Sequence, residues 1–170
     1  MAEEPIRPEY PAQMTERHSP VIYSTTCAYA MRAMARLAKI SPEGYMRIQE
    51  VCEGTDLPAH FVAKIFRHLV RGGVLVSARG RGGGFALARS PDKITLYDIV
   101  GVIDGVQQYT SCVTGLKQCS DENPCSQHHQ FKPVRSMILN YLQTTTLAQL
   151  GELAVQTPQT LVQLGQPAKD

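Results

Sequence analysis

The sequence has no tryptophan, and aromatic side chains make up only 6% of its 170 residues. It also lacks any apolar run close to the roughly 18 residues that a membrane-spanning helix needs. The N-terminus, Met-Ala-Glu-Glu-Pro, contains neither the basic start nor the apolar stretch of a secretory signal peptide. These absences predict a cytoplasmic protein that does not bind membranes.

The sequence also offers no constellation typical of an enzyme. We find no paired carboxylates and no Ser/His/Asp arrangement that would predict an active site. The glycine-rich run at residues 79–84, Arg-Gly-Arg-Gly-Gly-Gly, lacks the Gly-Lys-Ser/Thr with which a P-loop contacts phosphate and magnesium. We therefore expect a binding protein that catalyses no reaction.

The chain has only a small excess of positive over negative charge, with a formal net charge of +2. The distribution is uneven, however. Residues 15–90 carry eleven Lys and Arg against five Asp and Glu, whereas the segments on either side are mildly acidic. A basic module of this kind indicates nucleic acid as a partner, with a solvated basic surface as the alternative.

Apolar periodicity predicts helices over about 26–40, 47–53, 57–71 and 96–106. The second and third are joined by a tight turn at 54–56, which is the pattern of a helix-turn-helix. Strands expected at 74–78 and 85–88 flank the glycine-rich run and form a hairpin after this motif. The predicted fold is therefore mainly α with a small β-hairpin wing, that is, a winged helix-turn-helix.

In a helix-turn-helix, the second helix enters the DNA major groove with its N-terminal residues first. Basic side chains in a glycine-rich wing suit contacts to phosphates or to a minor groove, although an ordinary surface hairpin would look the same. The residues predicted to contact DNA lie in the first helix, in the recognition helix and in the wing: Thr26, Ala59, His60, Phe61, Ala63, Lys64, Arg67, Arg79 and Arg81.

The five cysteines fit a disulfide framework badly, because their number is odd and cytosolic thiols are kept reduced. Cys27 and Cys52 lie in helical patterns, and Cys27 is close to a helix N-terminus, where a thiolate is favoured. Cys112, Cys119 and Cys125 instead fall within fourteen residues of a polar stretch without apolar periodicity. Such a loop packs thiols poorly, so the clustering indicates that the sulfurs bind a ligand.

Thiolates favour iron–sulfur clusters, zinc and Cu(I). The C-x6-C-x5-C spacing is more open than the C-x2-C of a zinc knuckle and suits the wider spacing of an iron–sulfur centre. Three thiols leave one ligand missing, for which His128 is the nearest candidate and His129 the next. Zinc, redox-active thiols and thiols without a ligand remain alternatives at this point.

After the cysteine stretch, Phe131, Val134, Ile138 and Tyr141 repeat with the a/d spacing of a coiled-coil seam. This pattern predicts a long C-terminal helix that pairs with a partner chain or folds back. Pro133 is expected in the first turn of this helix, since elsewhere it would kink it. The predicted organisation is a disordered tail at 1–20, a winged-helix domain at 21–108, a cysteine-containing loop at 109–130, a dimerisation helix at 131–150 and a tail at 151–170.

These features together resemble the Rrf2 family of bacterial transcription regulators, of the iron–sulfur-binding type. The resemblance covers about residues 22–150 and rests on 29–33, 57–69, 73–87 and the three spaced cysteines. It implies a homodimer with N-terminal winged helices and a C-terminal dimerisation helix. It further implies a cluster bound by Cys112, Cys119 and Cys125, with 2Fe–2S favoured over 4Fe–4S, that senses redox state, nitric oxide or iron–sulfur status.

The resemblance leaves the branch of the family open. In the branch that regulates cluster assembly, a histidine three residues after the last cysteine is the fourth ligand, and His128 matches it. In the nitric-oxide-sensing branch an aspartate of the first helix can serve, and Ala28 stands at the matching position. The six-residue gap between Cys112 and Cys119 departs from the five residues of the assembly-type regulators.

The function implied is a transcription regulator, with a repressor favoured, that binds a pseudo-palindromic operator in double-stranded DNA under control of the cluster. A metal-free regulator that responds through thiol oxidation is the alternative. A small iron–sulfur electron carrier is a further one, but it would need neither the basic helix-turn-helix nor the wing.

Overall fold

The structure is a computed structural model that describes residues 22–41, 44–117 and 119–156. The predicted N-terminal tail at 1–20 and most of the predicted C-terminal tail lie outside the described residues. Within these residues the chain is mainly helical, with a single two-stranded antiparallel sheet. None of the described helices is long and apolar enough to cross a membrane.

Helix α1, Thr25–Ile40, lies at the centre of the fold. It contacts four other helices: α2 (Ile48–Cys52), α3 (Ala59–Arg71), α4 (Leu96–Ile103) and α6 (Leu147–Gln156). The Ser24 hydroxyl caps it by accepting a hydrogen bond from the backbone N–H of Cys27 at 3.1 Å. Small residues let neighbouring helices approach closely, and Ala30 and Ala33 are fully buried together with Met34 and Leu37. Helix α1 is therefore buried on most of its sides.

The helix-turn-helix consists of α2, Ile48–Cys52, and α3, Ala59–Arg71. One face of α3 forms a core stripe, because Val62, Ile65, Phe66 and Leu69 are all buried. Burial of each such side chain contributes about 1.5–3 kcal/mol. The opposite face of α3 therefore remains turned to solvent.

Two arginines of α1 hold the turn between α2 and α3. Arg32 forms an ion pair with Asp56, and Arg36 donates a hydrogen bond to the backbone carbonyl of Glu53. Both arginine side chains thus bind groups of the protein itself.

The wing consists of β1, Leu75–Ala78, and β2, Gly84–Leu87, paired from Leu75↔Leu87 to Ala78↔Gly84. Met46 adds a bridge on the other side of β2, with two backbone hydrogen bonds of 2.9 Å to Phe85. Gly84 is required at this junction, since a Cβ there would lie 2.3 Å from the Met46 carbonyl oxygen.

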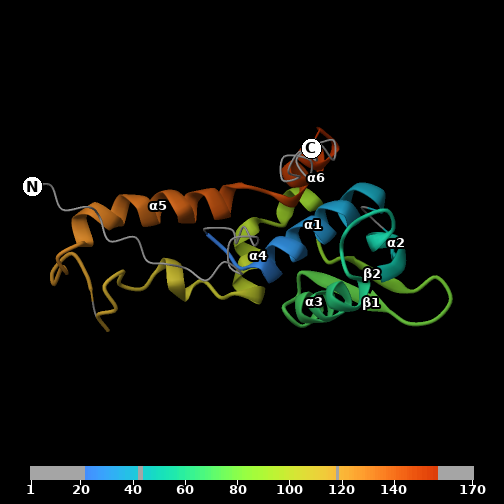
Figure 1. Cartoon of the computed structure of the whole chain (residues 1–170), viewed down its shortest axis with the longest axis horizontal. Coiled ribbons are helices and arrows are strands. Elements are labelled where there is room, and N and C mark those ends of the chain that lie inside the picture. Colours follow the sequence, from blue (N-terminus) through green and yellow to red (C-terminus); the bar gives the residue numbers. More distant parts are fainter. Residues whose placement is uncertain (1–21, 42–43, 118, 157–170) are drawn as a thin grey trace, which may run out of the picture.

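Beyond the wing, α4, Leu96–Ile103, begins at a capping box formed by Thr95 and Asp98. Two short 3₁₀ turns, η2 at Pro91–Lys93 and η3 at Gln107–Tyr109, precede and follow α4. The cysteine-containing loop follows at a distance from the winged helix, and the long helix α5, His128–Thr144, begins at this loop and runs back toward the winged helix (Figure 1).

The C-terminal region differs from the single helix expected over 131–150. Helix α5 begins earlier, at His128, and ends at Thr144, and a second helix, α6, spans Leu147–Gln156. The break follows because Thr145 and Leu147 exchange backbone hydrogen bonds with Leu96 and Ile94. Helix α6 then packs against α1, so the start of the predicted tail belongs to the fold.

Pro133 is the sixth residue of α5 and not part of its first turn, which corrects the prediction. Two residues of the expected a/d face are exposed in the single chain, Val134 at 45% and Tyr141 at 40%, and the neighbouring Met137 is 72% exposed. Phe131 and Ile138 are half-buried. Only the C-terminal end of α5 joins the core, through the fully buried Leu142.

We predict that Gly84→Ala destabilises the protein by about 1–3 kcal/mol, because the new Cβ overlaps the backbone of Met46 and separates the wing from residue 46. Chemical denaturation would measure this. Gly101→Ala is the matched control: its Cβ would meet only Val106 Cγ1 at 3.7 Å, and the α4 interior should gain about 0.5–1 kcal/mol. Equal stability of the two variants would contradict the prediction.

Candidate functional site

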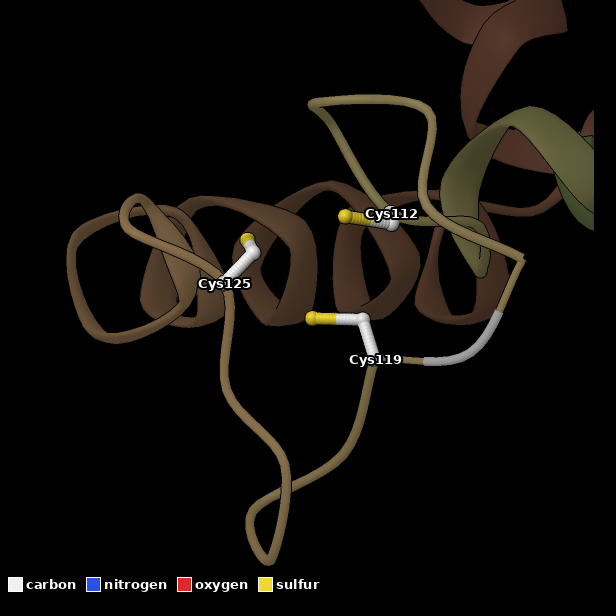
Figure 2. A group of neighbouring side chains, drawn as sticks. All are labelled: Cys112, Cys119 and Cys125. Atoms are coloured by element: carbon white, nitrogen blue, oxygen red, sulfur yellow. The ribbon is translucent and has the colours of Figure 1, made fainter.

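The three loop cysteines converge in space. Cys112 follows η3, Cys119 lies on the loop, and Cys125 lies three residues before His128, the first residue of α5. Their Sγ atoms all lie within 4.8 Å of one another, and Figure 2 shows the three side chains turned into a common space beside α5. Each of the three is half-exposed and none is in a disulfide. The structure therefore brings together the three residues that the sequence selected.

The thiols differ in their ease of ionisation. The pKa of Cys112 is lowered to about 6, chiefly by a hydrogen bond with the Thr114 hydroxyl at 3.1 Å. The pKa of Cys119 is raised: the backbone of Cys125 lowers it, but burial and the Cys125 and Cys112 sulfurs together raise it by more. One thiolate forms easily, and further thiolates repel it. A bound cation would relieve this repulsion.

His128 is the first residue of α5 and its side chain is only 5% exposed. Its Nδ1 lies 3.1 Å from Cys119 Sγ, and its Nε2 lies 2.8 Å from Asp121 Oδ1. Lys132, one turn further along α5, places its ammonium 2.6 Å from both carboxylate oxygens of Asp121. These neighbours lower the pKa of Asp121 to about 2, with the Lys132 hydrogen bond as the largest cause.

Three thiolates and one imidazole make a donor set that suits a thiophilic metal. Around one tetrahedral ion, sulfurs lie about 3.8 Å apart and sulfur and nitrogen about 3.5 Å, for metal–ligand distances of about 2.3 and 2.0–2.1 Å. The three sulfurs lie within 4.8 Å of one another, and His128 Nδ1 lies 3.1 Å from one of them, Cys119 Sγ. The three thiols therefore fit a metal centre, and His128 is a further nitrogen donor next to Cys119, which suits a His-ligated iron–sulfur cluster.

A cavity of about 660 Å³ adjoins the thiols, lined by residues of the segment 110–120 that include Cys112 and Cys119. Two apolar side chains of the same loop, Val113 and Leu116, are about half exposed, at 49% and 52%. Small molecules can therefore reach the sulfurs from this side.

Cys27 and Cys52 belong to the core. Cys27 is fully buried, and burial, followed by the charge of Asp104, raises its pKa to about 12. The position near the helix N-terminus thus does not produce a thiolate. Burial also raises the pKa of Cys52, although Arg36 opposes it.

The outer face of α3 and the wing carry the residues predicted to contact DNA. His60, Lys64 and Arg67 are exposed on α3, and Arg79 and Arg81 are exposed in the turn between the strands. Arg67 Nε donates to the Ala63 carbonyl within the helix, which leaves the end of its guanidinium free to reach outward. Helix α3 and the turn between β1 and β2 lie toward the end of the molecule opposite the cysteine-containing loop (Figure 1).

The smaller predicted DNA-contacting residues are less open. Thr26, Ala59 and Ala63 are half-buried, the first in the opening turn of α1 and the others on α3. Phe61 packs edge-on against Tyr29 of α1, with ring centroids 5.6 Å apart. Its ring therefore contributes to the packing between α1 and α3.

Sequence reasoning missed two polar residues next to the thiols, Asp121 and Lys132. An available signal was the i, i+4 spacing of His128 and Lys132, which places both side chains on one face of α5. The carboxylate that binds both side chains belongs to Asp121, which lies on the loop eleven residues before Lys132. No local sequence pattern predicts this contact.

Comparison with known proteins identifies the fold and the function class. The sequence model of the Rrf2 family, described as an iron-dependent transcriptional regulator, matches residues 23–152. The chain belongs to the Rrf2 family. It is a winged-helix, DNA-binding transcription regulator and not an enzyme, as the sequence predicted.

An HTH-type transcriptional regulator of Aquifex aeolicus is 34% identical over 132 residues, covering 76% of this chain and 91% of that protein. IscR of Erwinia tasmaniensis is 28% identical over 122 residues, covering 72% and 73%. Among solved structures, CymR, described as the global cysteine regulator of B. subtilis, has a TM-score of 0.61 at 28% identity, covering 76% and 95%. T. potens IscR has the same TM-score at 27% identity, covering 82% and 93%.

The thiol environments predict distinct reactivities in the reduced, metal-free protein. Alkylation of Cys112 by iodoacetamide should rise with pH and reach half its maximal rate near pH 6, because the reactive thiolate predominates above the pKa. Cys27 should remain unmodified up to pH 9 until the protein is denatured, since it is buried and its pKa is about 12. Peptide mass spectrometry would assign the sites, and similar rates at both residues would contradict the prediction.

Proposed function

We propose that this regulator binds an iron–sulfur cluster through Cys112, Cys119, Cys125 and His128, and that the state of the cluster controls its affinity for operator DNA. The observation that carries the proposal is the convergence of the three sulfurs within 4.8 Å, with the His128 imidazole beside them. A 2Fe–2S cluster is favoured over 4Fe–4S, because a histidine ligand is characteristic of 2Fe–2S centres of the Rieske type.

Two features favour iron over zinc. The family is described as iron-dependent, and IscR regulators are among the relatives. The half-exposed position of the thiols beside a cavity also suits a centre that meets a diffusible signal better than a closed structural zinc site.

When bound, the cluster would supply a centre that oxygen, nitric oxide or iron limitation can alter or remove. The chain's own contacts would carry the change to the winged helix. Tyr109, three residues before Cys112, is buried, and its hydroxyl donates to the Ile22 carbonyl at the entry to α1. On the other side, Arg135 of α5 donates to the Thr110 carbonyl at 3.4 Å. A rearrangement of the loop would thus act on both α1 and α5.

We further propose that the protein acts as a homodimer, a repressor by preference, on a pseudo-palindromic operator. The exposed apolar face of α5, centred on Val134, Met137 and Tyr141, supports pairing with the same face of a second copy. Two copies would then present two α3 helices and two wings to successive turns of the DNA major groove. The absence of a membrane-spanning helix among the described residues agrees with a cytoplasmic location.

A metal-free regulator is the second candidate. The similarity to CymR and the closeness of the ionised Cys112 to two other thiols support it, since a thiolate at this distance can attack a neighbouring oxidised sulfur. In that case a peroxide would oxidise one thiolate to a sulfenic acid, a neighbouring thiol would form a disulfide with it and release water, and the disulfide would reshape the same loop.

Anaerobic purification followed by visible spectroscopy and assays of iron, sulfide and zinc separates the candidates. We expect a coloured protein with iron and sulfide, loss of the cluster in Cys119→Ser, and little change in Cys52→Ser, whose thiol is in the core. DNA binding should change on exposure to oxygen or nitric oxide. A colourless, iron-free protein after reconstitution would refute the cluster, and a redox response in that protein would support the thiol alternative.

The DNA interface gives a separate prediction. Lys64→Ala should weaken operator binding about tenfold or more, as expected for the loss of a groove or phosphate contact worth about 1–3 kcal/mol in each of two subunits. The slope of affinity against salt concentration should become shallower. Lys93→Ala, which removes the same charge from η2, is the control and should leave both unchanged. Fluorescence anisotropy over a salt series measures these effects.

A further inference from the structure

The described part of the loop contains a carboxylate that the proposed function does not use. Asp121 lies two residues after Cys119, and its side chain is 67% exposed, yet it contacts the nearly buried imidazole of His128. Its Oδ1 accepts hydrogen bonds from His128 Nε2 at 2.8 Å and from Lys132 Nζ at 2.6 Å. Its Oδ2 accepts a hydrogen bond from Lys132 Nζ at 2.6 Å.

The hydrogen-bond roles follow from the charge of Asp121. An ionised carboxylate can only accept, so Nε2 of His128 must carry the hydrogen in this contact. In the neutral ring, Nδ1 then holds a lone pair, and this atom faces Cys119 Sγ at 3.1 Å. The unprotonated nitrogen of the imidazole, whose lone pair can bind a metal, thus points at the thiols.

We propose that Asp121 is a positioning residue that sets the tautomer and orientation of His128, so that Nδ1 is the atom presented to the metal, and that Lys132 holds Asp121 in place. The effect of Asp121 on metal binding rests on the proposed iron–sulfur function. Histidines that ligate metals almost always donate their other ring N–H to a carboxylate, carbonyl or water, which fixes the ring and raises its basicity.

The arrangement distinguishes His128 from its neighbour. His129, the other candidate fourth ligand, is exposed and packs edge-on against the His128 ring, with centroids 5.4 Å apart. Among the described residues no carboxylate contacts its ring within hydrogen-bond distance. The backbone N–H of His128 also donates to the Cys125 carbonyl at 3.0 Å, which ties this histidine to a second thiol-bearing residue.

Asp121→Ala tests the inference, with Glu122→Ala as its matched control. Glu122 is the adjacent carboxylate, and it accepts from the Ser120 hydroxyl at 3.2 Å and does not contact His128. Both variants remove one negative charge from the same exposed turn, so their difference isolates the contact with the imidazole. Unchanged thermal unfolding of the two variants would show that each is folded.

The first readout needs no metal. Long-range ¹H–¹⁵N spectra of the reduced, metal-free protein should show His128 as the Nε2–H tautomer in the wild type and in Glu122→Ala, and as a mixture in Asp121→Ala. The second readout is the rate at which a chelator removes iron from the anaerobic holoprotein. That rate should rise about 10–100-fold in Asp121→Ala, and stay within about twofold of wild type in Glu122→Ala.

The inference is overturned if Asp121→Ala keeps the Nε2–H tautomer, or if it loses iron no faster than Glu122→Ala does. If the wild-type protein binds no iron, the proposed function fails, and the tautomer comparison alone then decides whether Asp121 positions His128. The two failures are thereby distinguishable.

Discussion

The burial of α1 is the constraint on which the rest of the structure depends. Its alanines let α2, α3, α4 and α6 pack closely around one helix, and Ala30, Ala33, Met34 and Leu37 are fully buried in that centre. Because α3 is placed by this packing, the groove-reading face and the wing take their positions from α1. The C-terminal α6 returns to the same helix, so both ends of the described chain share one core.

The thiol site obeys a different constraint, namely electrostatic repulsion in a loop with little packing. The Cys112 thiol ionises easily, since its pKa is lowered, whereas ionisation of the neighbouring Cys119 thiol is disfavoured, since its pKa is raised. A cation bound among the sulfurs would therefore change the loop's stability as well as its charge. The chain surrounds the site with its own fixed contacts: α5 begins at His128, and Tyr109 and Arg135 connect the start of the loop to α1 and α5. The cysteine-containing loop and the winged helix are thus separate structures joined by α5.

Much of this arrangement was predictable from local pattern. The buried stripe of α3, the hairpin after it and the cap at Thr95 follow from side-chain periodicity and turn chemistry, which act over a few residues. The end of α5 was not predictable in this way. The 131–150 stretch has helical periodicity on both sides of Thr145, and the break there depends on hydrogen bonds to Ile94 and Leu96, some fifty residues earlier in the chain.

The sequence by itself determined the class of protein and which three cysteines form the candidate site. A helix-turn-helix, a glycine-rich wing and three spaced cysteines are each local features of the chain. Only the tertiary structure decided how the remaining polar groups are used. It assigned Arg32 and Arg36 to the turn of the helix-turn-helix, enclosed Cys27 in the core, and joined Asp121 to His128 and Lys132. These outcomes depend on which surfaces approach one another and exclude water, and no single segment contains that information.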